Sequence, residues 1–466
     1  MSRKNKKMSN KVRSHSDRSL KAIQPNAAGI DLGSKEHWVA GPPGDDDKPN
    51  VKCFGTTTPE LNRLADWLQE QGVETVAMES TGVYWIPLFE VLDSRGFQVV
   101  LANARQISNV PGRKTDILDC QWIQLLHACG LLRGSFRPSD DICRLRALIR
   151  ERGTMVDERA DWIRRMQKYL DQMNIRVHRA VSDITGLTGM AIIRAIVGGE
   201  RDPYALAKLR DRRCRKSGQQ IAEELTGNWR PEHLFNLGQA LKMYDQLSAV
   251  IGDYDNEILS CIGQLQPDDA DDTPLPPHGS KTKARNIARR GQEPLRQALY
   301  QLSGVDLTAI DGVSVDTAAV IISEIGLDYS CFPHEKHFIS YLRLAPNLAI
   351  SGGKKIAKRF KATTCTRVTS ALRMAALTLR NSKTALGGFY RRVAYRKGAS
   401  VAVFATARKL AQLIYRLVCY GQTYVDEGAQ AYEARFNQRR LIHYTHALKN
   451  MGFRVEPMTE FEAVPT

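Results

Sequence analysis

The sequence predicts an α/β region followed by two mainly helical regions. Between residues 26 and 140, short apolar runs alternate with amphipathic stretches, which is typical of a mixed sheet covered by helices. From about residue 141, apolar residues recur at spacings of three and four, which indicates long helices. Between Ser351 and Arg416 there are sixteen Lys or Arg and no Asp or Glu, so the last region combines helices with strong positive charge.

The first region begins with three strands and continues with alternating helices and strands. The strands are predicted at NAAGIDLGSKEHWVAGPPG, which holds two around a Gly-Ser turn, and at VKCFGTTT. A helix is predicted at PELNRLADWLQEQG, which has an early Pro, apolar residues at 61, 64, 65 and 68, and a terminal Gly. There follow strand VETVAM, helix VYWIPLFEVLDSRG, strand FQVVLAN and helix DILDCQWIQLLHACG. This order, β-β-β-α-β-α-β-α, resembles the ribonuclease H-like fold of the RuvC type, in which acidic residues gather at one edge of the central strands.

Two long helices are predicted in the second region. Their apolar stripes, with spacings of three and four, are Leu145, Leu148, Ile149, Val156, Ile163, Met166, Leu170 and Met173, and then Leu237, Leu241, Tyr244, Leu247, Ile251, Tyr254, Ile258, Ile262 and Leu265. Such spacing over four heptads favours a coiled-coil arm whose helices pack together or dimerise. Two ordinary core helices of a bundle are the alternative interpretation.

Composition divides the chain into six segments. They are a disordered basic tail (1–25), the RuvC-like domain (26–140), a helical coiled-coil domain (141–270), a Pro-rich linker (271–300), a mainly helical C-terminal domain (301–428) and a helical tail (429–466). Within the C-terminal domain, LTAIDGVSVDTAAVIISEIG has the helix, Gly turn and helix pattern of a helix-hairpin-helix that clamps a nucleic-acid backbone, with Ser314 in place of a second Gly.

The charge balance predicts a polyanionic partner. The chain of 466 residues carries a formal net charge of +17, and its acid-free basic region is typical of a surface that contacts phosphates. The nine cysteines are scattered without a C-x-x-C pair, which argues against a disulfide framework or zinc site and favours a reducing compartment. No apolar run is long enough to span a membrane, and the N-terminus lacks a secretory h-region. We therefore expect a cytoplasmic, nucleoid-associated protein.

Four acids are expected to meet at one edge of the predicted sheet: Asp31, Glu79, Asp116 and Asp119. The spacing of three puts Asp116 and Asp119 on one helical face. We expect the buried side of that helix to carry Leu118, Trp122 and Leu125. Four converging carboxylates would raise one another's pKa values, and divalent ions such as Mg²⁺ remove that penalty.

Single acids have simpler interpretations. Asp119 alone is typical of a first helical turn, where the helix dipole favours a carboxylate. Asp31 in a strand-turn is also compatible with a phosphate-binding ATPase of the actin and sugar-kinase type. The ordered set of four favours metal.

At this point the residues resemble a known family. Three stretches resemble the N-terminal domain of the DEDD transposases of the insertion-sequence 110 family: NAAGIDLGSKEHWVA, AMESTGVYWIPL and NVPGRKTDILDCQWI. Two more resemble its C-terminal transposase domain, with a Ser-Gly-Gly-Lys signature and closing helices: RLAPNLAISGGKKIAKRF and FYRRVAYRKGASVAVFATARKLAQLIYRLV.

The resemblance implies a Mg²⁺-dependent DNA transposase and recombinase that cuts and rejoins element and target DNA. By family behaviour, the four acids would bind two Mg²⁺ ions, with Mn²⁺ as a substitute, and Ser351 would be the nucleophile. It also implies guidance by a structured bridge RNA and assembly as a homodimer or homotetramer, with the coiled coil mediating oligomerisation. The cations expected to contact nucleic acid are Arg113, Lys114, Lys354, Lys355, Lys358, Arg359, Arg391, Arg392, Arg396 and Lys397.

Two other functions stay open. A metal-dependent, RuvC-like, structure-specific nuclease would use water instead of serine and form no covalent adduct. A non-catalytic nucleic-acid-binding remnant of an element would bind with steep salt dependence but hold no Mg²⁺.

Overall fold

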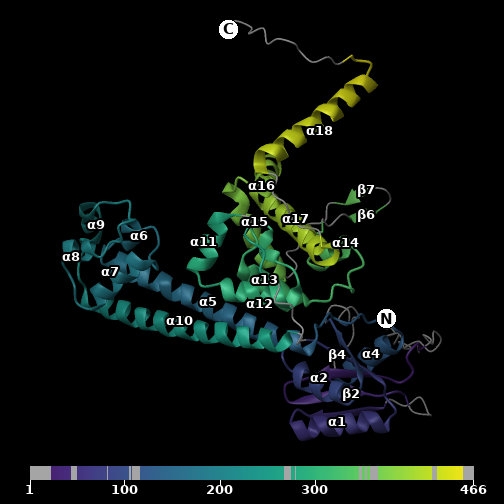
Figure 1. Cartoon of the computed structure of the whole chain (residues 1–466). Coiled ribbons are helices and arrows are strands. Elements are labelled where there is room, and N and C mark those ends of the chain that lie inside the picture. Colours follow the sequence, from purple (N-terminus) through teal and green to yellow (C-terminus); the bar gives the residue numbers. More distant parts are fainter. Residues whose placement is uncertain are drawn as a thin grey trace, which may run out of the picture. The chain divides into compact units, whose positions relative to one another are not determined.

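The chain divides into two compact units, residues 1–137 and 138–466 (Figure 1). The computed structural model describes residues 22–43, 50–80, 82–103, 107, 116–266, 274–278, 280–345, 349–351, 354–356, 366–421 and 428–454, with only the backbone described at 349–351 and 354–356.

The N-terminal unit is built on a five-stranded mixed sheet, and it has the order of elements predicted from the sequence. Its elements are β1 (Ala27–Leu32), β2 (Glu36–Ala40), β3 (Val51–Gly55), α1 (Thr58–Glu70), β4 (Thr75–Glu79), α2 (Trp85–Ser94), β5 (Gln98–Ala102) and α4 (Asp116–Ala128). The strand order is β3-β2-β1-β4-β5. β2 pairs antiparallel with β1 and β3, whereas β4 pairs parallel with β1 and β5. This topology confirms the predicted RuvC-like α/β class.

Helices cover both faces of this sheet (Figure 1). Because side chains alternate along a strand, Ala28 and Ile30 of β1 pack into one core with α1 and α2. Ala77 of β4 faces the other way and packs with Ile123 of α4. The second face matters for function, since Asp31 and Glu79 follow Gly29 and Ala77 at the same period of two.

The predicted buried side of α4 is wrong. Leu118 and Leu125 are exposed and Trp122 is half-buried, whereas the buried residues of this helix are Cys120, Ile123, Leu126, His127 and Ala128. Apolar residues lie almost all round the helix, so their spacing did not define one face.

The C-terminal unit begins with a long helical arm. Its two helices, α5 (Asp140–Gln172) and α10 (Pro231–Leu265), pack side by side within the chain. The small helices at the far end are α6 (Val177–Ala180), α7 (Leu187–Val197), α8 (Pro203–Lys208) and α9 (Gly218–Leu225) (Figure 1). A separate apolar core joins these helices to the arm around Met166, Leu170 and Leu237.

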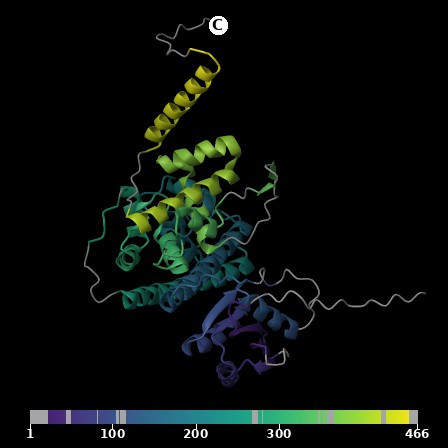
Figure 2. The ribbon, with the colours of Figure 1, turned by 90° about the vertical axis from the view of Figure 1, so that its right-hand side faces the viewer.

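The remaining helices gather over the base of the arm (Figures 1 and 2). The elements are α11 (Lys281–Arg289), α12 (Glu293–Ser303), η1 (Leu307–Ala309), α13 (Val315–Ile325), α14 (Glu335–Tyr341), β6 (Ala349–Ser351), β7 (Lys354–Ile356), α15 (Arg367–Thr378), η2 (Leu379–Asn381), α16 (Ala385–Lys397), α17 (Ala399–Tyr420) and α18 (Gly428–Asn450). Their core includes Leu145 and Ile262 of the arm. Arg150 of α5 also donates two hydrogen bonds to Glu324 of α13, at 2.7 and 2.6 Å.

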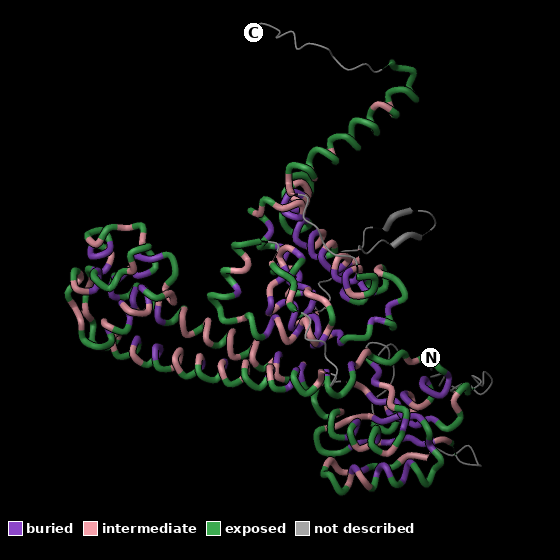
Figure 3. The backbone as a smooth tube through the Cα atoms, viewed as in Figure 1, coloured by how far each residue is buried: buried purple, intermediate pink, exposed green. Residues whose placement is uncertain are grey.

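Part of the segment predicted as a linker is folded. Residues 281–289 form α11, and Ile287 is buried in the core of the unit. α18 is different, because none of its residues is buried (Figure 3). In the part of the chain that the structure describes, no helix is long and apolar enough to cross a membrane.

Candidate active site

The four predicted acids lie on three elements of the N-terminal unit. Asp31 is near the end of β1, Glu79 is the last residue of β4, and Asp116 and Asp119 lie in the first turn of α4. Because β1 and β4 are parallel neighbours, their carboxyl ends meet at the same edge of the sheet. Asp31 and Glu79 both face the side of the sheet that α4 covers.

α4 runs antiparallel to β4 across this face. Near its end, His127 Nε2 lies 2.8 Å from Thr75 Oγ1 at the start of β4. From His127 back to Asp119 the helix rises by roughly 12 Å, at 1.5 Å per residue. From Thr75 forward to Glu79 the strand rises by roughly 13 Å, at 3.3 Å per residue. The first turn of α4 therefore reaches the same level as Glu79.

Gly29 allows α4 to lie this close to β1. A Cβ atom built on Gly29 would lie 2.2 Å from the backbone nitrogen of Gln124 and 2.6 Å from the carbonyl oxygen of Cys120. Side-chain atoms cannot occupy such positions, so only glycine permits this contact. The Gln124 side chain also donates a hydrogen bond to the carbonyl oxygen of Ala27, at 3.2 Å. These contacts fix α4 against β1 at Ala27 and Gly29. Asp31 lies two residues beyond Gly29, on the same face of the strand.

The electrostatics of Asp31 reflect the other three acids. Burial first, and then the charges of Asp116, Asp119 and Glu79 in that order, together raise the pKa of its carboxyl from 3.8 to about 6, against a hydrogen bond from the Leu32 backbone that lowers it. Each neighbour is thus close enough to disfavour a negative charge on Asp31. A carboxylate in such surroundings is stabilised in its charged form by a nearby cation.

A fifth carboxylate, Glu36 on β2, was missed in the sequence. Trp38 pairs with Asp31 across the β1–β2 ladder, so Glu36, two residues away, lies on the same face as both. Glu36 accepts hydrogen bonds from Trp38 Nε1 at 3.2 Å and from Cys53 Sγ at 3.5 Å. Burial raises the pKa of the Cys53 thiol, and Glu36 and Asp116 raise it further. The alternation of side chains along β2 could have revealed Glu36, because it places residues 36 and 38 on the same face of the strand.

The donor set fits a hard divalent ion, although the side chains do not already converge on one point. Mg²⁺ and Ca²⁺ prefer carboxylate oxygens, and all four acids supply them. Among the described residues, no three Asp, Glu, His or Cys side chains lie close enough to form a metal-binding group. Asp116 is exposed and Asp119 half-buried, so their carboxylates have room to change rotamer. Four like charges repel one another, and a cation between them would offset that repulsion.

The predicted nucleophile lies in a small hairpin of the C-terminal unit. Ser351 is the last residue of β6, and its backbone pairs with Lys354, the first residue of β7, in an antiparallel ladder. Lys355 pairs with Ile350. Four of the predicted nucleic-acid contacts lie outside the described residues: Arg113, Lys114, Lys358 and Arg359.

Of the six predicted contacts within the described residues, Lys354 and Lys355 lie in β7 and the other four lie on α16. Arg391 and Arg392 are in its middle, and Arg396 and Lys397 are in its last turn. Arg391 Nη1 donates to the carbonyl oxygens of Arg380 and Ser382, at 3.2 and 2.6 Å, which holds the guanidinium beside η2.

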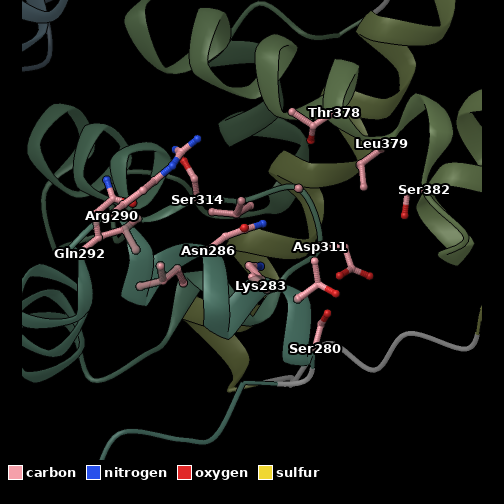
Figure 4. Close-up of a pocket in the computed structure, with 15 residues that line it drawn as sticks. Ser280, Lys283, Asn286, Arg290, Gln292, Asp311, Ser314, Thr378, Leu379 and Ser382 are labelled. Atoms are coloured by element: carbon pink, nitrogen blue, oxygen red, sulfur yellow. The ribbon is translucent and has the colours of Figure 1, made fainter. Parts of the chain in front are cut away.

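The helix-hairpin-helix pattern forms one wall of a hollow of about 410 Å³ (Figure 4). Its first element is the short 3₁₀ helix η1 and not an α-helix. Gly312 has a φ of 85°, as a tight turn requires. Ser314 replaces a glycine because its side chain caps α13 and accepts a hydrogen bond from the Thr317 backbone at 3.1 Å. From α11, Lys283 donates to the carbonyl oxygens of Ile310, at 3.0 Å, and Thr308, so its charge secures the turn.

Two family models match the chain, one over the N-terminal unit and the arm's first helix and the other over part of the C-terminal helices. Residues 28–175 match the DEDD transposases of the IS110 type, described as a transposase. Residues 305–391 match the transposase IS116/IS110/IS902 family. The chain belongs to the IS110 family of transposases. No curated protein matches it.

The first match contains the four acids, and the second contains Ser351 and ends at Arg391, the first arginine of α16. The protein is therefore an insertion-sequence transposase, an enzyme whose substrate is DNA. The DEDD match also implies dependence on a divalent metal ion. These conclusions replace the interpretation of the chain as a non-catalytic remnant.

Proposed function

We propose that this transposase cuts and rejoins element and target DNA with Mg²⁺ held by Asp31, Glu79, Asp116 and Asp119, and with Ser351 as the nucleophile. The observation that carries the metal assignment is that the ends of β1 and β4 and the first turn of α4 meet at one edge of the sheet, where burial and the charges of the other three acids raise the pKa of Asp31 to about 6. A carboxylate under such strain gains most from a nearby cation. Mn²⁺ has the same preference for oxygen ligands and would substitute.

The acids would act by placing positive charge against the scissile phosphate. Divalent ions held by these four acids would supply positive charge that offsets the negative charge developing on the phosphate. Asp31 and Glu79 lie on paired strands, which supports a rigid pair of ligands. Asp116 and Asp119 lie on a helical turn and have more freedom, which supports a role in adjusting to metal and substrate.

Ser351 would exchange one phosphate ester for another. Its Oγ forms a bond to phosphorus and loses its proton, while the bond from phosphorus to one deoxyribose oxygen breaks and that oxygen takes up a proton. The product is a phosphoserine ester that conserves the bond energy for rejoining. Because attack on a phosphodiester depends on charge neutralisation and in-line placement, neighbouring cations matter more than a strong base. Lys354 and Lys355, which begin β7, are the nearest in the ladder.

We further propose that a bridge RNA from the element selects the DNA, and that the enzyme works as a homodimer or homotetramer. The acid-free stretch between Ser351 and Arg416 supports binding of nucleic-acid backbones without sequence readout. Purified transposase, candidate RNA transcribed from the element's flank, both DNAs and Mg²⁺ test this together. Recombination that needs the RNA and changes target with its sequence would support guidance, and RNA-independent recombination would refute it.

The metal assignment is tested by Glu79→Gln. We expect strand exchange to fall by at least about 100-fold, because a carboxylate ligand is lost where charge neutralisation supplies most of the catalysis, while DNA binding stays within about twofold. Glu70→Gln, at an exposed position of α1, is the matched control in the same unit. If the Glu79 variant retains exchange, the acid cluster does not hold the catalytic metal.

The nucleophile is tested by Ser351→Ala. Trapping on a labelled suicide DNA substrate, followed by denaturing electrophoresis, should show a protein–DNA adduct for the parent protein and none for the variant. Ser340→Ala, at an exposed serine of α14, is the control and should keep the adduct. DNA cleavage without any adduct in the parent protein would instead identify water as the nucleophile.

A further inference from the structure

A groove between α16 and α18 has a composition that the reaction proposed above does not use. It has a volume of about 570 Å³ and is lined by four arginines, three aromatic residues and one acid. The arginines are Arg391, Arg392, Arg396 and Arg440, the aromatics are Tyr395, Phe436 and Tyr444, and the acid is Glu433. We propose that this groove binds an unpaired nucleic-acid strand, with a base stacked on Tyr395 and phosphates held by the arginines. This rests on the proposed action of the transposase on nucleic acid and names the form of strand it holds.

Contacts between α16 and α18 shape the groove and fix several of its side chains. The N-terminal part of α18 lies beside α16, and the remainder extends away from the other helices (Figures 1 and 3). The Phe389 and Tyr432 rings meet edge to face at 6.5 Å, and the Ala429 backbone donates to the carbonyl oxygen of Lys383 at 3.0 Å. A Cβ on Gly388 would lie 3.2 Å from the Tyr432 ring, so this small residue lets the helices approach.

Two of the four arginines, Arg392 and Arg440, are held over aromatic faces. The Arg392 guanidinium lies 3.4 Å from the Phe436 ring centroid and 4.7 Å from that of Tyr432. Arg440 lies 5.8 Å from Phe436 and 5.5 Å from Tyr444. A guanidinium stacked in this way keeps donors at its edge for a phosphate. The positive charges are thus positioned before any ligand binds.

Two further observations indicate a missing ligand. Arg392 Nη1 is buried and has no hydrogen-bond partner within the described residues, which is costly for a charged donor. None of the four arginines forms an ion pair with another described residue, although Glu433 lies in the same groove. The phosphates of a strand would supply the negative charge that the groove lacks beside its four arginines.

The exposed ring distinguishes an unpaired strand from a duplex. Tyr395 is 94% exposed, which is unusual for an aromatic residue surrounded by arginines. In a duplex the base faces are covered by their neighbours, so a duplex would use only the arginines. In a single strand each base can stack on a ring, and such stacking tolerates any sequence. Tyr395 therefore favours an unpaired strand of either RNA or DNA.

The test measures binding of fluorescent 20-nucleotide RNA, DNA of the same sequence, and the corresponding DNA duplex to the full-length protein by anisotropy, in EDTA. For Tyr395→Ala we expect about tenfold weaker binding of single strands, the order of one lost base stack, and unchanged duplex binding. Tyr395→Phe should restore single-strand affinity because it keeps the ring. Tyr204→Ala, at a 63% exposed tyrosine of α8, is the control and should change nothing.

The arginines are tested by the salt dependence of the same binding. Arg440→Gln should weaken single-strand binding and lower the slope of log affinity against log salt by about 0.7, whereas Lys208→Gln on α8 should not. Greater loss with RNA or with DNA identifies the natural strand, and either supports the groove. Equal losses for single strands and duplex, no loss with Tyr395→Ala, or loss of self-association in sedimentation instead of strand binding would overturn the proposal. Because the assay needs neither metal nor Ser351, its failure leaves the proposed chemistry untouched, and inactivity of the Ser351 variant leaves the groove untouched.

Discussion

The substitution Gly29→Ala should disable the acid cluster without altering any acid. The added Cβ would lie 2.2 Å from the Gln124 nitrogen, whereas ordinary contacts begin at about 3.4 Å. The difference means that α4 or β1 must move by about 1.2 Å. Both neighbours within 2.6 Å are backbone atoms of a helix, so no side-chain rotation relieves the clash. The displaced helix carries Asp116 and Asp119 away from Asp31.

Overpacking of this kind costs about 1–3 kcal/mol, which should lower the unfolding temperature by roughly 3–10 °C. A displacement near 1 Å in a catalytic arrangement costs about 100-fold in rate. We therefore expect weaker Mg²⁺ binding by calorimetry and about 100-fold slower strand exchange, at a temperature where the variant is folded.

Gly134→Ala is the matched control in the same unit. Its Cβ would meet only Val100, at an ordinary 3.8 Å, so Mg²⁺ affinity and exchange should be unchanged. If Gly29→Ala binds Mg²⁺ and recombines like the parent protein, the close approach of α4 does not organise the metal site. If the Gly29→Ala variant only unfolds at a lower temperature and keeps its Mg²⁺ affinity and exchange rate, the contact serves stability alone.

Two further predictions concern ionised groups. The folded-state pKa of Asp31, about 6, lies above its ordinary value of 3.8, so the metal-free protein should lose stability as pH rises from about 4 through 6. Asp31→Asn should then raise the metal-free unfolding temperature at pH 7.5 by about 2–4 °C while weakening Mg²⁺ binding, since about 1 kcal/mol remains after discounting for solvent screening; a variant no more stable than its parent at that pH would contradict this. Arg296, with a side chain 2% exposed, holds the 7% exposed Asp306 at 2.6 Å, so Arg296→Met should leave a buried charge and cost about 3–5 kcal/mol, or roughly 10 °C by calorimetry. Arg63→Met, which breaks an exposed pair with Glu60, should cost less than about 1 kcal/mol, and equal losses would show that burial is not the cause.

The elements of the N-terminal unit could be predicted because strong local patterns agree with one another. α1 buries Leu61, Leu64, Ala65 and Leu68, the four positions whose spacing predicted it. The convergence of Asp31 and Glu79 also followed from strand order, since parallel neighbours end at one edge.

The errors have a common origin in tertiary contacts. The burial of Cys120 and Ile123 instead of Leu118 and Leu125 depends on the missing side chain at Gly29, which lies more than ninety residues away. Similarly, the basic residues of α11 are typical of a linker in the sequence. Only the burial of Ile287 in the core of the C-terminal unit shows that this segment is folded. Glu36 joins the acids only through its register with β1.

The sequence by itself determined the family, the mixed sheet, the acidic set and the positive charge, because each of these depends on residue types and short periodicities. The tertiary structure decided which face of α4 meets the sheet, how strongly Asp31 is perturbed, and that arginines and rings of α16 and α18 share one groove. These depend on distances between atoms far apart in the chain, and local sequence patterns carry no information about such distances.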